Sequence, residues 1–192
     1  MAEPQNVVAE VIGETELAHR IAELGTAISQ DYAGKRPVLV AVLNGALWFL
    51  ADLVRAIDIE VEVDFLALNR FGEGGRIRIA MDTYQSLAER HVIVVEDIVD
   101  TGLSLMALHR LLRERQPASL ATAALLDKVS RRLVDTPLEY RGFEVGDEFL
   151  IGYGLDWEGH HRNLPGVWAV LDLAAFAGGP GVLFQAGDNL PA

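Results

Sequence analysis

The chain has 192 residues, of which 51% are hydrophobic and 23% are charged; this length and composition fit one folded domain and exclude a disordered chain. It contains no cysteine, which excludes disulfide bonds, thiolate metal sites and a cysteine nucleophile. Its 28 acidic and 16 basic residues give a net charge of −12, which argues against binding to nucleic acid or to an anionic membrane surface.

The first third of the chain predicts helices that alternate with buried strands. Apolar residues at helical spacing predict a helix over residues 14–33, and a continuous apolar run predicts a strand buried on both faces over residues 37–43. A helical pattern then returns over residues 47–57. Alternating apolar residues predict a further strand over residues 60–68.

The rest of the chain continues this pattern. Three glycines and no periodicity predict a mobile loop over residues 69–76, followed by a short strand at 77–81. A buried strand over residues 91–95 ends in two acids, and a helix follows over residues 103–115. Later strands are expected at 120–126, within 139–151 and at 167–171. This order indicates an α/β fold with a mainly parallel sheet covered by helices on both sides.

The sequence also indicates in which cellular compartment the protein is expected. No stretch reaches the roughly 18 consecutive apolar residues of a membrane-spanning helix. Residues 1–5 lack the basic region of a signal peptide. With the absence of cysteine, these features predict a cytoplasmic protein.

The segment from Val92 to Ser104 carries the chemistry. A buried strand places Glu96 and Asp97 at its C-terminal end, and a turn then leads into a helix. Backbone N–H groups at a helix start form a site for phosphate, and Gly102 allows close approach of the anion. Carboxylates beside a phosphate are repulsive unless they bind sugar hydroxyls or Mg²⁺. The segment therefore predicts a site for a phosphorylated sugar.

A simpler interpretation of the same segment is an ordinary turn with a helix N-cap at Asp100 or Thr101. That interpretation accounts for the turn. It does not account for the two acids, Glu96 and Asp97, at the end of an otherwise apolar strand.

The segment resembles the phosphoribosyl pyrophosphate (PRPP) motif of type I phosphoribosyltransferases, which is a hydrophobic run, two acids, two hydrophobic residues and Asp-Thr-Gly-x-Ser. Three more segments are similar to the hypoxanthine-guanine class of these enzymes: Leu125–Lys128 followed by Arg131 and Arg132, Phe149–Asp156, and Arg162–Pro165. The resemblance runs in order over about residues 12–173.

The resemblance implies a fold and an organisation. The fold is a mainly parallel, twisted sheet flanked by helices, with a small hood built from the chain ends. The chain forms a single phosphoribosyltransferase domain over residues 1–192, with a core at about 12–173 and a C-terminal tail at 174–192. Members of this family also lead us to expect a homo-oligomer, either a dimer or a tetramer.

The resemblance assigns roles around PRPP. Glu96 and Asp97 bind the ribose hydroxyls, directly or through Mg²⁺, and Asp100 faces purine N7 as the general acid/base. The 5′-phosphate is held by backbone and hydroxyl groups of Asp100, Thr101, Gly102, Leu103 and Ser104. Pyrophosphate contacts are assigned to Asn44, Gly45 and Arg162, and the flexible loop carries Arg70 and Phe71.

The resemblance assigns further roles around the purine. Lys128 donates to the 6-oxo group, Phe149 stacks on the base, and the Leu150 backbone binds the base edge. Asp156 lies by the purine and contributes, with Glu96 and Asp97, to a magnesium site. A lysine suits the acceptor of a 6-oxopurine, whereas adenine presents a donor there and is rejected.

The implied activity is purine salvage: transfer of the 5-phosphoribosyl group from PRPP to hypoxanthine, with guanine as a second base, giving the nucleoside monophosphate and pyrophosphate. Mg²⁺ is the expected cofactor. One alternative is an enzyme that prefers xanthine or guanine. The other is a PRPP-sensing regulator of the same fold that binds RNA, against which the acidic composition argues.

The sequence departs from the family pattern at three places. Asn44 precedes Gly45 where relatives have lysine or arginine, so the pyrophosphate contacts must come from backbone N–H groups, which a cis peptide in the family loop aims inward. Arg70 and Phe71 stand where relatives have Ser-Tyr, and Leu103 stands where some have lysine. We expect these departures to affect rate and substrate range rather than the type of reaction.

Overall fold

The computed structural model describes residues 7–71 and 76–178, without the side chains of residues 70, 71, 76 and 77. The chain divides into two compact units. The core unit spans Thr15–Asp147, and the hood unit combines the segment up to Glu14 with the segment from Glu148 onward. The hood is thus built from both ends of the chain, as the resemblance implies.

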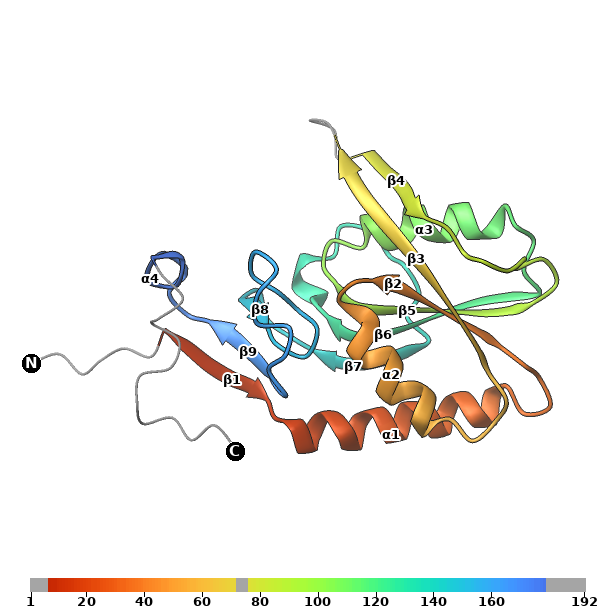
Figure 1. The fold of residues 1–192 in the computed structure, drawn as a ribbon, viewed down its shortest axis with the longest axis horizontal. Coiled ribbons are helices and arrows are strands. Elements are labelled where there is room, and N and C mark those ends of the chain that lie inside the picture. Colours follow the sequence, from red (N-terminus) through yellow and green to blue (C-terminus); the bar gives the residue numbers. More distant parts are fainter. Residues whose placement is uncertain (1–6, 72–75, 179–192) are drawn as a thin grey trace, which may run out of the picture. The chain divides into compact units, whose positions relative to one another are not determined.

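A six-stranded sheet forms the centre of the core unit (Figure 1). In spatial order its strands are β4 (Arg76–Met81), β3 (Glu62–Phe71), β2 (Val38–Leu43), β5 (His91–Val99), β6 (Ser119–Asp127) and β7 (Tyr140–Glu144). All neighbouring strands are parallel except β4, which pairs antiparallel with β3. The α/β prediction with a mainly parallel sheet is therefore confirmed.

Helices cover both faces of this sheet. Helices α1 (Glu14–Asp31) and α2 (Ala46–Ala56) lie on one face, and α3 (Leu103–Arg113) lies on the other (Figure 1). Alternate residues of β2 and β5, with the apolar side of α3, form one buried cluster that includes Val38, Val40, Val92, Val94, Leu105, Leu108 and Leu112. Since side chains alternate across a strand, the continuous apolar runs bury residues on both faces.

The hood unit has its own antiparallel sheet and its own small core. Its strands, in spatial order, are β1 (Val8–Ile12), β9 (Val167–Val170) and β8 (Phe149–Ile151). Ile151, Leu164, Val170 and Phe176 form the buried cluster. Phe176 comes from α4 (Leu173–Ala177), so the stretch predicted as a tail begins with a short helix, capped by the Asp172 side chain. Residues 179–192 lie outside the described residues.

One strand boundary predicted from the sequence is wrong. Strand β5 does not end before Glu96 but continues to Val99, because its parallel pairing with β6 persists from Glu96 opposite Ala124 to Val99 opposite Asp127. The stretch 139–151 supplies two strands, β7 and β8, which belong to different sheets and are separated by a polar turn at residues 145–148.

The predicted loop at residues 69–76 is also too long. Strand β3 continues to Phe71 and β4 begins at Arg76, with Arg70 paired to Ile77 and Phe71 paired to Arg76. The backbones of Arg70 and Phe71 are therefore part of a strand pair. The remaining loop residues, 72–75, lie outside the described residues. In the part of the chain that the structure describes, no helix is long and apolar enough to cross a membrane.

A buried histidine joins α3 to the sheet and makes stability depend on pH. His109 is 4% exposed, and its Nε2 lies 2.6 Å from Thr122 Oγ1 on β6. Burial lowers the pKa of His109 below its ordinary value, with a smaller effect of the same sign from Arg113. The unfolded chain therefore takes up this proton first as the pH falls, so the free energy of unfolding decreases below about pH 6.5.

We expect His109→Gln to lose part of this pH dependence, because glutamine does not titrate. The measurement is urea unfolding of both proteins at pH 7.5 and pH 5.5. The free energy of unfolding should decrease more in the wild type than in the variant over that interval. Equal decreases would show that other groups account for the whole effect.

Candidate active site

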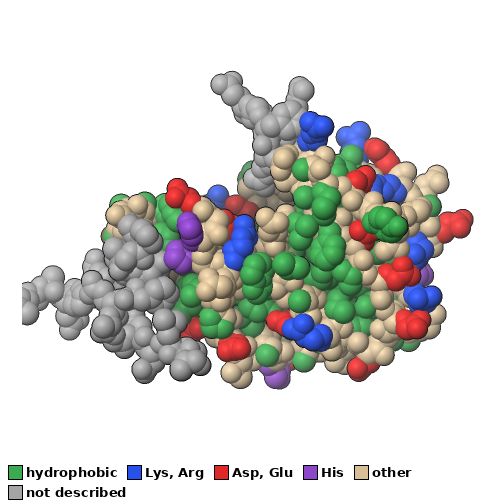
Figure 2. Space-filling model, viewed as in Figure 1, with side chains coloured by type: hydrophobic (Ala, Val, Ile, Leu, Met, Phe, Trp, Pro, Cys, Tyr) green, Lys and Arg blue, Asp and Glu red, His purple; other side chains and the backbone are tan. Residues whose placement is uncertain are grey.

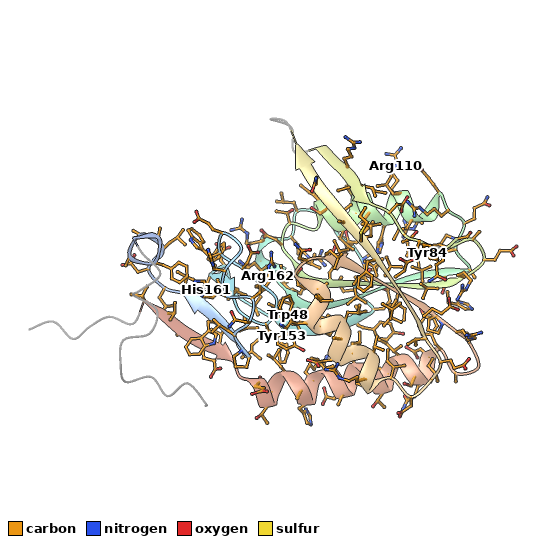
Figure 3. All side chains as sticks on the ribbon, viewed as in Figure 1. Trp48, Tyr84, Arg110, Tyr153, His161 and Arg162 are labelled. Atoms are coloured by element: carbon orange, nitrogen blue, oxygen red, sulfur yellow. The ribbon has the colours of Figure 1, made fainter. Side chains whose placement is uncertain are left out.

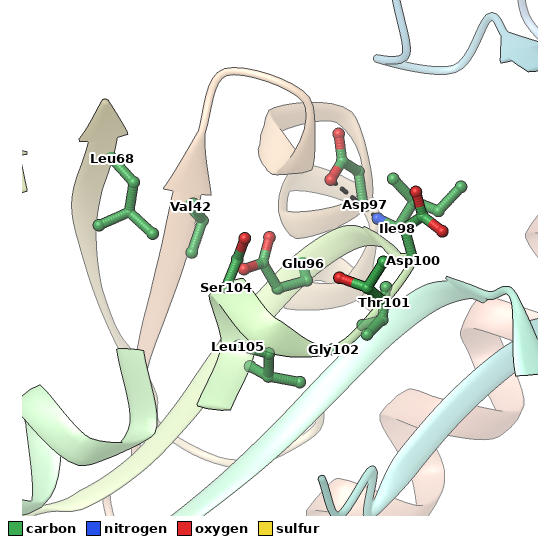
Figure 4. Close-up of a pocket in the computed structure, with 11 residues that line it drawn as sticks. Val42, Leu68, Glu96, Asp97, Ile98, Asp100, Thr101, Gly102, Ser104 and Leu105 are labelled. Atoms are coloured by element: carbon green, nitrogen blue, oxygen red, sulfur yellow. Dashed lines mark hydrogen bonds between the residues drawn. The ribbon is translucent and has the colours of Figure 1, made fainter. Parts of the chain in front are cut away.

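A pocket of about 400 Å³ opens at the carboxyl end of the central strands of the core unit (Figure 4). Its lining consists of Val42, Leu68, residues 96–102, Ser104 and Leu105. Ligands of parallel α/β sheets bind at this edge, where the ends of neighbouring strands meet the starts of helices. The pocket thus brings together all the residues predicted to bind the ribose and the 5′-phosphate except Leu103, which begins α3 beside it.

The turn between β5 and α3 requires glycine at position 102. Gly102 has a φ of 80°, in the left-handed region, and a Cβ there would lie 2.7 Å from Arg132 Nη1 and 3.1 Å from Val134. The first N–H groups of α3 have no partner inside the helix and carry its positive dipole end. The loop at residues 100–104 is therefore a backbone site for an anion such as phosphate.

The two acids of β5 lie inside this pocket. Glu96 is 8% exposed, and Asp97 Oδ1 accepts the N–H of Ile98 at 2.8 Å (Figure 4). Asp97 Oδ2 lies 1.5 Å from where a Cβ on Gly45 would be, so a side chain at position 45 would displace the carboxylate. The pyrophosphate loop predicted at Asn44 and Gly45 therefore packs directly against Asp97.

The donor set fits Mg²⁺ bound together with a phosphorylated substrate. Mg²⁺ prefers carboxylate oxygens and is commonly held by one or two of them, with water and substrate phosphates completing its coordination. Glu96 and Asp97 supply such oxygens on adjacent residues of one strand. Among the described residues, no group of three or more His, Cys, Asp or Glu side chains could hold a metal alone.

The pyrophosphate loop joins β2 to α2. The peptide bond between Leu43 and Asn44 is cis, as the resemblance to the family implies. Leu47 N–H donates to Asn44 O at 3.2 Å, which begins the first turn of α2. Gly45, the N-cap of α2, lies against the Asp97 carboxylate.

The predicted acid/base residue, Asp100, is held by an arginine. Arg131 Nε donates to Asp100 Oδ1 at 2.6 Å, and Arg131 Nη1 donates to Asp147 Oδ1 at 2.6 Å. These hydrogen bonds raise the pKa of Arg131, and the bond from Arg131 lowers the pKa of Asp147. Arg131 lies in a segment that is similar to the family, but the resemblance implied no role for this residue. Its partners stand 31 and 16 residues away along the chain, so spacing gave no signal for the contacts.

The predicted purine-binding lysine lies at the end of β6, beside the phosphate loop. Lys128 is 8% exposed, its N–H donates to Val99 O at 2.9 Å, and its Nζ donates to Asp147 O at 3.3 Å. The neighbouring Asp127 is buried and accepts bonds from Arg132 Nε at 3.0 Å and Arg141 Nη1 at 3.3 Å. These two arginines compensate the buried carboxylate and fix the end of β6.

The remaining predicted residues belong to the hood unit. Phe149 is 39% exposed and makes an edge-to-face contact with Trp157, with ring centroids 5.1 Å apart. Leu150 is buried and pairs with Ala169 of β9. An exposed ring supported by a second ring is suited to stack on a planar base.

Asp156 and Arg162 bind each other within the hood unit. Arg162 Nη2 lies 2.7 Å from Asp156 Oδ1, and Asp156 Oδ2 accepts the N–H of Gly159 at 2.7 Å. Arg162 (labelled in Figure 3) also donates to the Gly154 carbonyl. The structure therefore places Glu96 and Asp97 in the core unit and Asp156 in the hood unit. The magnesium role of Asp156 and the pyrophosphate role of Arg162 stay predictions.

Comparison with known proteins identifies the family of this chain. Residues 12–158 match the family model of the phosphoribosyl transferase domain. A hypoxanthine phosphoribosyltransferase of Haemophilus influenzae is 43% identical over 161 residues, which are 80% of this chain and 90% of that protein. A hypoxanthine-guanine phosphoribosyltransferase of Aquifex aeolicus is 42% identical over 167 residues, which are 84% of this chain and 94% of that protein.

Solved structures show the same fold. A hypoxanthine-guanine phosphoribosyltransferase of Bacillus anthracis superposes with a TM-score of 0.83 at 38% identity, over 85% of this chain and 98% of that one. The hypoxanthine phosphoribosyltransferase of Trypanosoma cruzi, in complex with the product IMP, gives a TM-score of 0.82 at 35% identity, over 88% and 97% of the two chains. This chain belongs to the phosphoribosyltransferase family.

Proposed function

We propose that the protein is a hypoxanthine phosphoribosyltransferase, which converts hypoxanthine and PRPP to IMP and pyrophosphate and also accepts guanine. The observation that carries the proposal is one pocket lined by Glu96, Asp97, the carboxylate of Asp100 and the backbone at the start of α3. The relatives described above are named for this activity, and one was solved with IMP.

The proposed reaction replaces one bond at the glycosidic carbon by another. Purine N9 forms a bond to C1′ of the ribose as the bond from C1′ to pyrophosphate breaks, through a transition state with oxocarbenium character. Asp100 accepts the N7 proton of the base, which makes N9 the better nucleophile. The backbone N–H groups at residues 100–104 hold the 5′-phosphate, and Glu96 and Asp97 hold the ribose hydroxyls.

Pyrophosphate must be stabilised as it leaves. Mg²⁺, when bound with PRPP, neutralises part of this charge. Without a basic residue at position 44, the backbone N–H groups of Asn44 and Gly45 supply the contacts from the core unit, and Arg162 is our proposed cation from the hood unit. Arg70 and Phe71, at the end of β3, are proposed to contribute to the cover of the site.

The purine contacts determine which base is used. Lys128 Nζ is proposed to donate to O6, while Phe149 stacks on the ring and the Leu150 backbone binds its edge. Asp156 is proposed to complete this side of the site. Because a 6-oxopurine offers an acceptor to Lys128 and adenine offers a donor, adenine is excluded.

We further propose that the protein forms a homo-oligomer. Hydrophobic side chains gather on the surface of the core unit around α2 and β3 (Figure 2), where Leu47 is 42% exposed and Val63 is 39% exposed. An exposed apolar surface of this kind favours association with another protein surface. Light scattering on the purified protein gives the number of subunits, and a monomer would contradict the proposal.

The test of the activity is an assay with PRPP, Mg²⁺ and one base at a time: hypoxanthine, guanine, xanthine or adenine. We expect turnover with hypoxanthine and guanine and none with adenine. Asp100→Asn should lower turnover by about 10²-fold, the usual loss when a general acid/base is removed. PRPP binding should change little, since backbone groups hold the phosphate. Turnover mainly with xanthine, or none with any base, would reject the proposed substrate.

Lys128→Met should weaken the use of 6-oxopurines selectively. The substitution keeps the aliphatic stem in its buried position and removes the donor to O6. We expect kcat/KM for hypoxanthine to fall about tenfold or more, the loss typical of a hydrogen bond from a charged group. The KM for PRPP should stay within about twofold of the wild type. An equal loss of PRPP affinity would contradict a role at the base.

Gly45→Ala should impair the use of PRPP, because a Cβ at this position would occupy the place of Asp97 Oδ2. We expect kcat/KM for PRPP to fall at least about tenfold, since displacements near 1 Å have effects of this size. Gly13→Ala is the matched control, because its Cβ would lie 3.9 Å from the nearest atom. Wild-type kinetics in Gly45→Ala would show that Asp97 can move without affecting the sugar site.

A further inference from the structure

The segment that follows β6 contains an arginine whose contacts join two parts of the proposed site. Arg131 ends a short 3₁₀ helix, Val129–Arg131, for which Lys128 is the N-cap. Its Nε and Nη1 donate to Asp100 Oδ1 and Asp147 Oδ1, each at 2.6 Å. Asp147 also receives Lys128 Nζ on its backbone carbonyl at 3.3 Å. The Arg131 guanidinium thus links Asp100, which is proposed to accept the N7 proton, to Asp147. The carbonyl of Asp147 in turn binds Lys128, the proposed donor to O6.

The bond to Asp100 leaves the carboxylate usable for catalysis. Arg131 binds one oxygen, Oδ1, and a carboxylate has a second oxygen that can accept the N7 proton. A guanidinium cannot lose a proton near neutral pH, so Arg131 cannot itself take part in the proton transfer. Its two donors are fixed in one plane and bind two different carboxylates, which restricts the positions of Asp100 and Asp147 relative to each other.

The exposure of these side chains argues against a role in holding the fold together. Arg131 is 43% exposed, Asp100 is 47% exposed and Asp147 is 68% exposed. Ion pairs this accessible to water contribute little to stability. The neighbouring Arg132 differs, since it is 15% exposed and pairs with the buried Asp127.

We propose that Arg131 is a positioning residue: it orients the Asp100 carboxylate toward purine N7 and keeps the loop of Asp147 in place beside Lys128. The inference rests on the proposed function, because it assigns Arg131 a task in the same reaction. It adds a residue that touches neither the base nor PRPP but acts through Asp100.

The decisive experiment is a double-mutant cycle between Arg131→Met and Asp100→Asn. If Arg131 acts through Asp100, Arg131→Met lowers kcat about tenfold in the wild-type background and less than about twofold when Asp100 is already asparagine. The KM for PRPP should stay within about twofold in both backgrounds. The melting temperature should shift by no more than about 4 °C.

Two further variants separate orientation from charge. Arg131→Lys keeps the charge but loses the planar pair of donors, so kcat should lie between those of the wild type and Arg131→Met. Arg36→Met is the control: Arg36 pairs with Glu60 away from the pocket, with exposures of 64% and 76%, and its loss should leave kcat and both KM values unchanged.

Several outcomes would overturn the inference. Additive effects in the cycle would show that Arg131 does not act through Asp100. A raised KM for PRPP that Arg131→Lys restores completely would mean that Arg131 only attracts the anionic substrate. Unchanged kcat in Arg131→Met, with an active wild type, would reject the positioning role but not the proposed function. A wild type that is inactive with every base would instead reject the proposed function.

Discussion

The active site depends on the parallel pairing of β5 with β6 beyond the point where the apolar run ends. The pairing continues through Glu96, Ile98 and Val99, although two of the four residues after Val95 are acids. It holds the carboxylates on a strand, where backbone geometry fixes their separation, rather than on a loop. The turn to α3 follows immediately, so a single continuous strand fixes the proposed phosphate loop relative to Glu96 and Asp97.

Electrostatics is the second constraint on this part of the molecule. A chain of net charge −12 places Glu96, Asp97 and Asp100 around a pocket proposed for an anionic substrate, and it buries Asp127 at the end of the neighbouring β6. Arginines compensate two of these carboxylates: Arg131 binds Asp100, and Arg132 and Arg141 bind Asp127. Helix N-termini and the backbone of the phosphate loop supply further positive potential. The acidic surface and the anion site are thus compatible, because the compensation is local.

The sequence predicted those parts of the site that lie close together along the chain. The acids, the phosphate loop and the start of α3 occupy nine consecutive residues, so the pattern alone indicated how they are arranged. The extent of β5 was not predictable in this way, since pairing with β6 outweighed the polarity of Glu96 and Asp97. The hood strand β1 was missed for a similar reason, because it is a short strand whose partner, β9, lies far along the chain.

The contacts of Arg131 and Arg132 could not be predicted from the sequence for a different reason. Arg131 and Arg132 are adjacent and chemically identical, yet one reaches Asp100 and the other lies beneath Gly102, with Nη1 2.7 Å from where a Cβ would be. The 3₁₀ helix that begins after Lys128 is what separates their directions. Residues 128–132 therefore contact the Asp147 loop, the Asp100 carboxylate and the turn at Gly102. A substitution that alters this short helix should consequently affect all of these contacts together, whereas a change in one arginine side chain should affect only the contacts that this side chain makes.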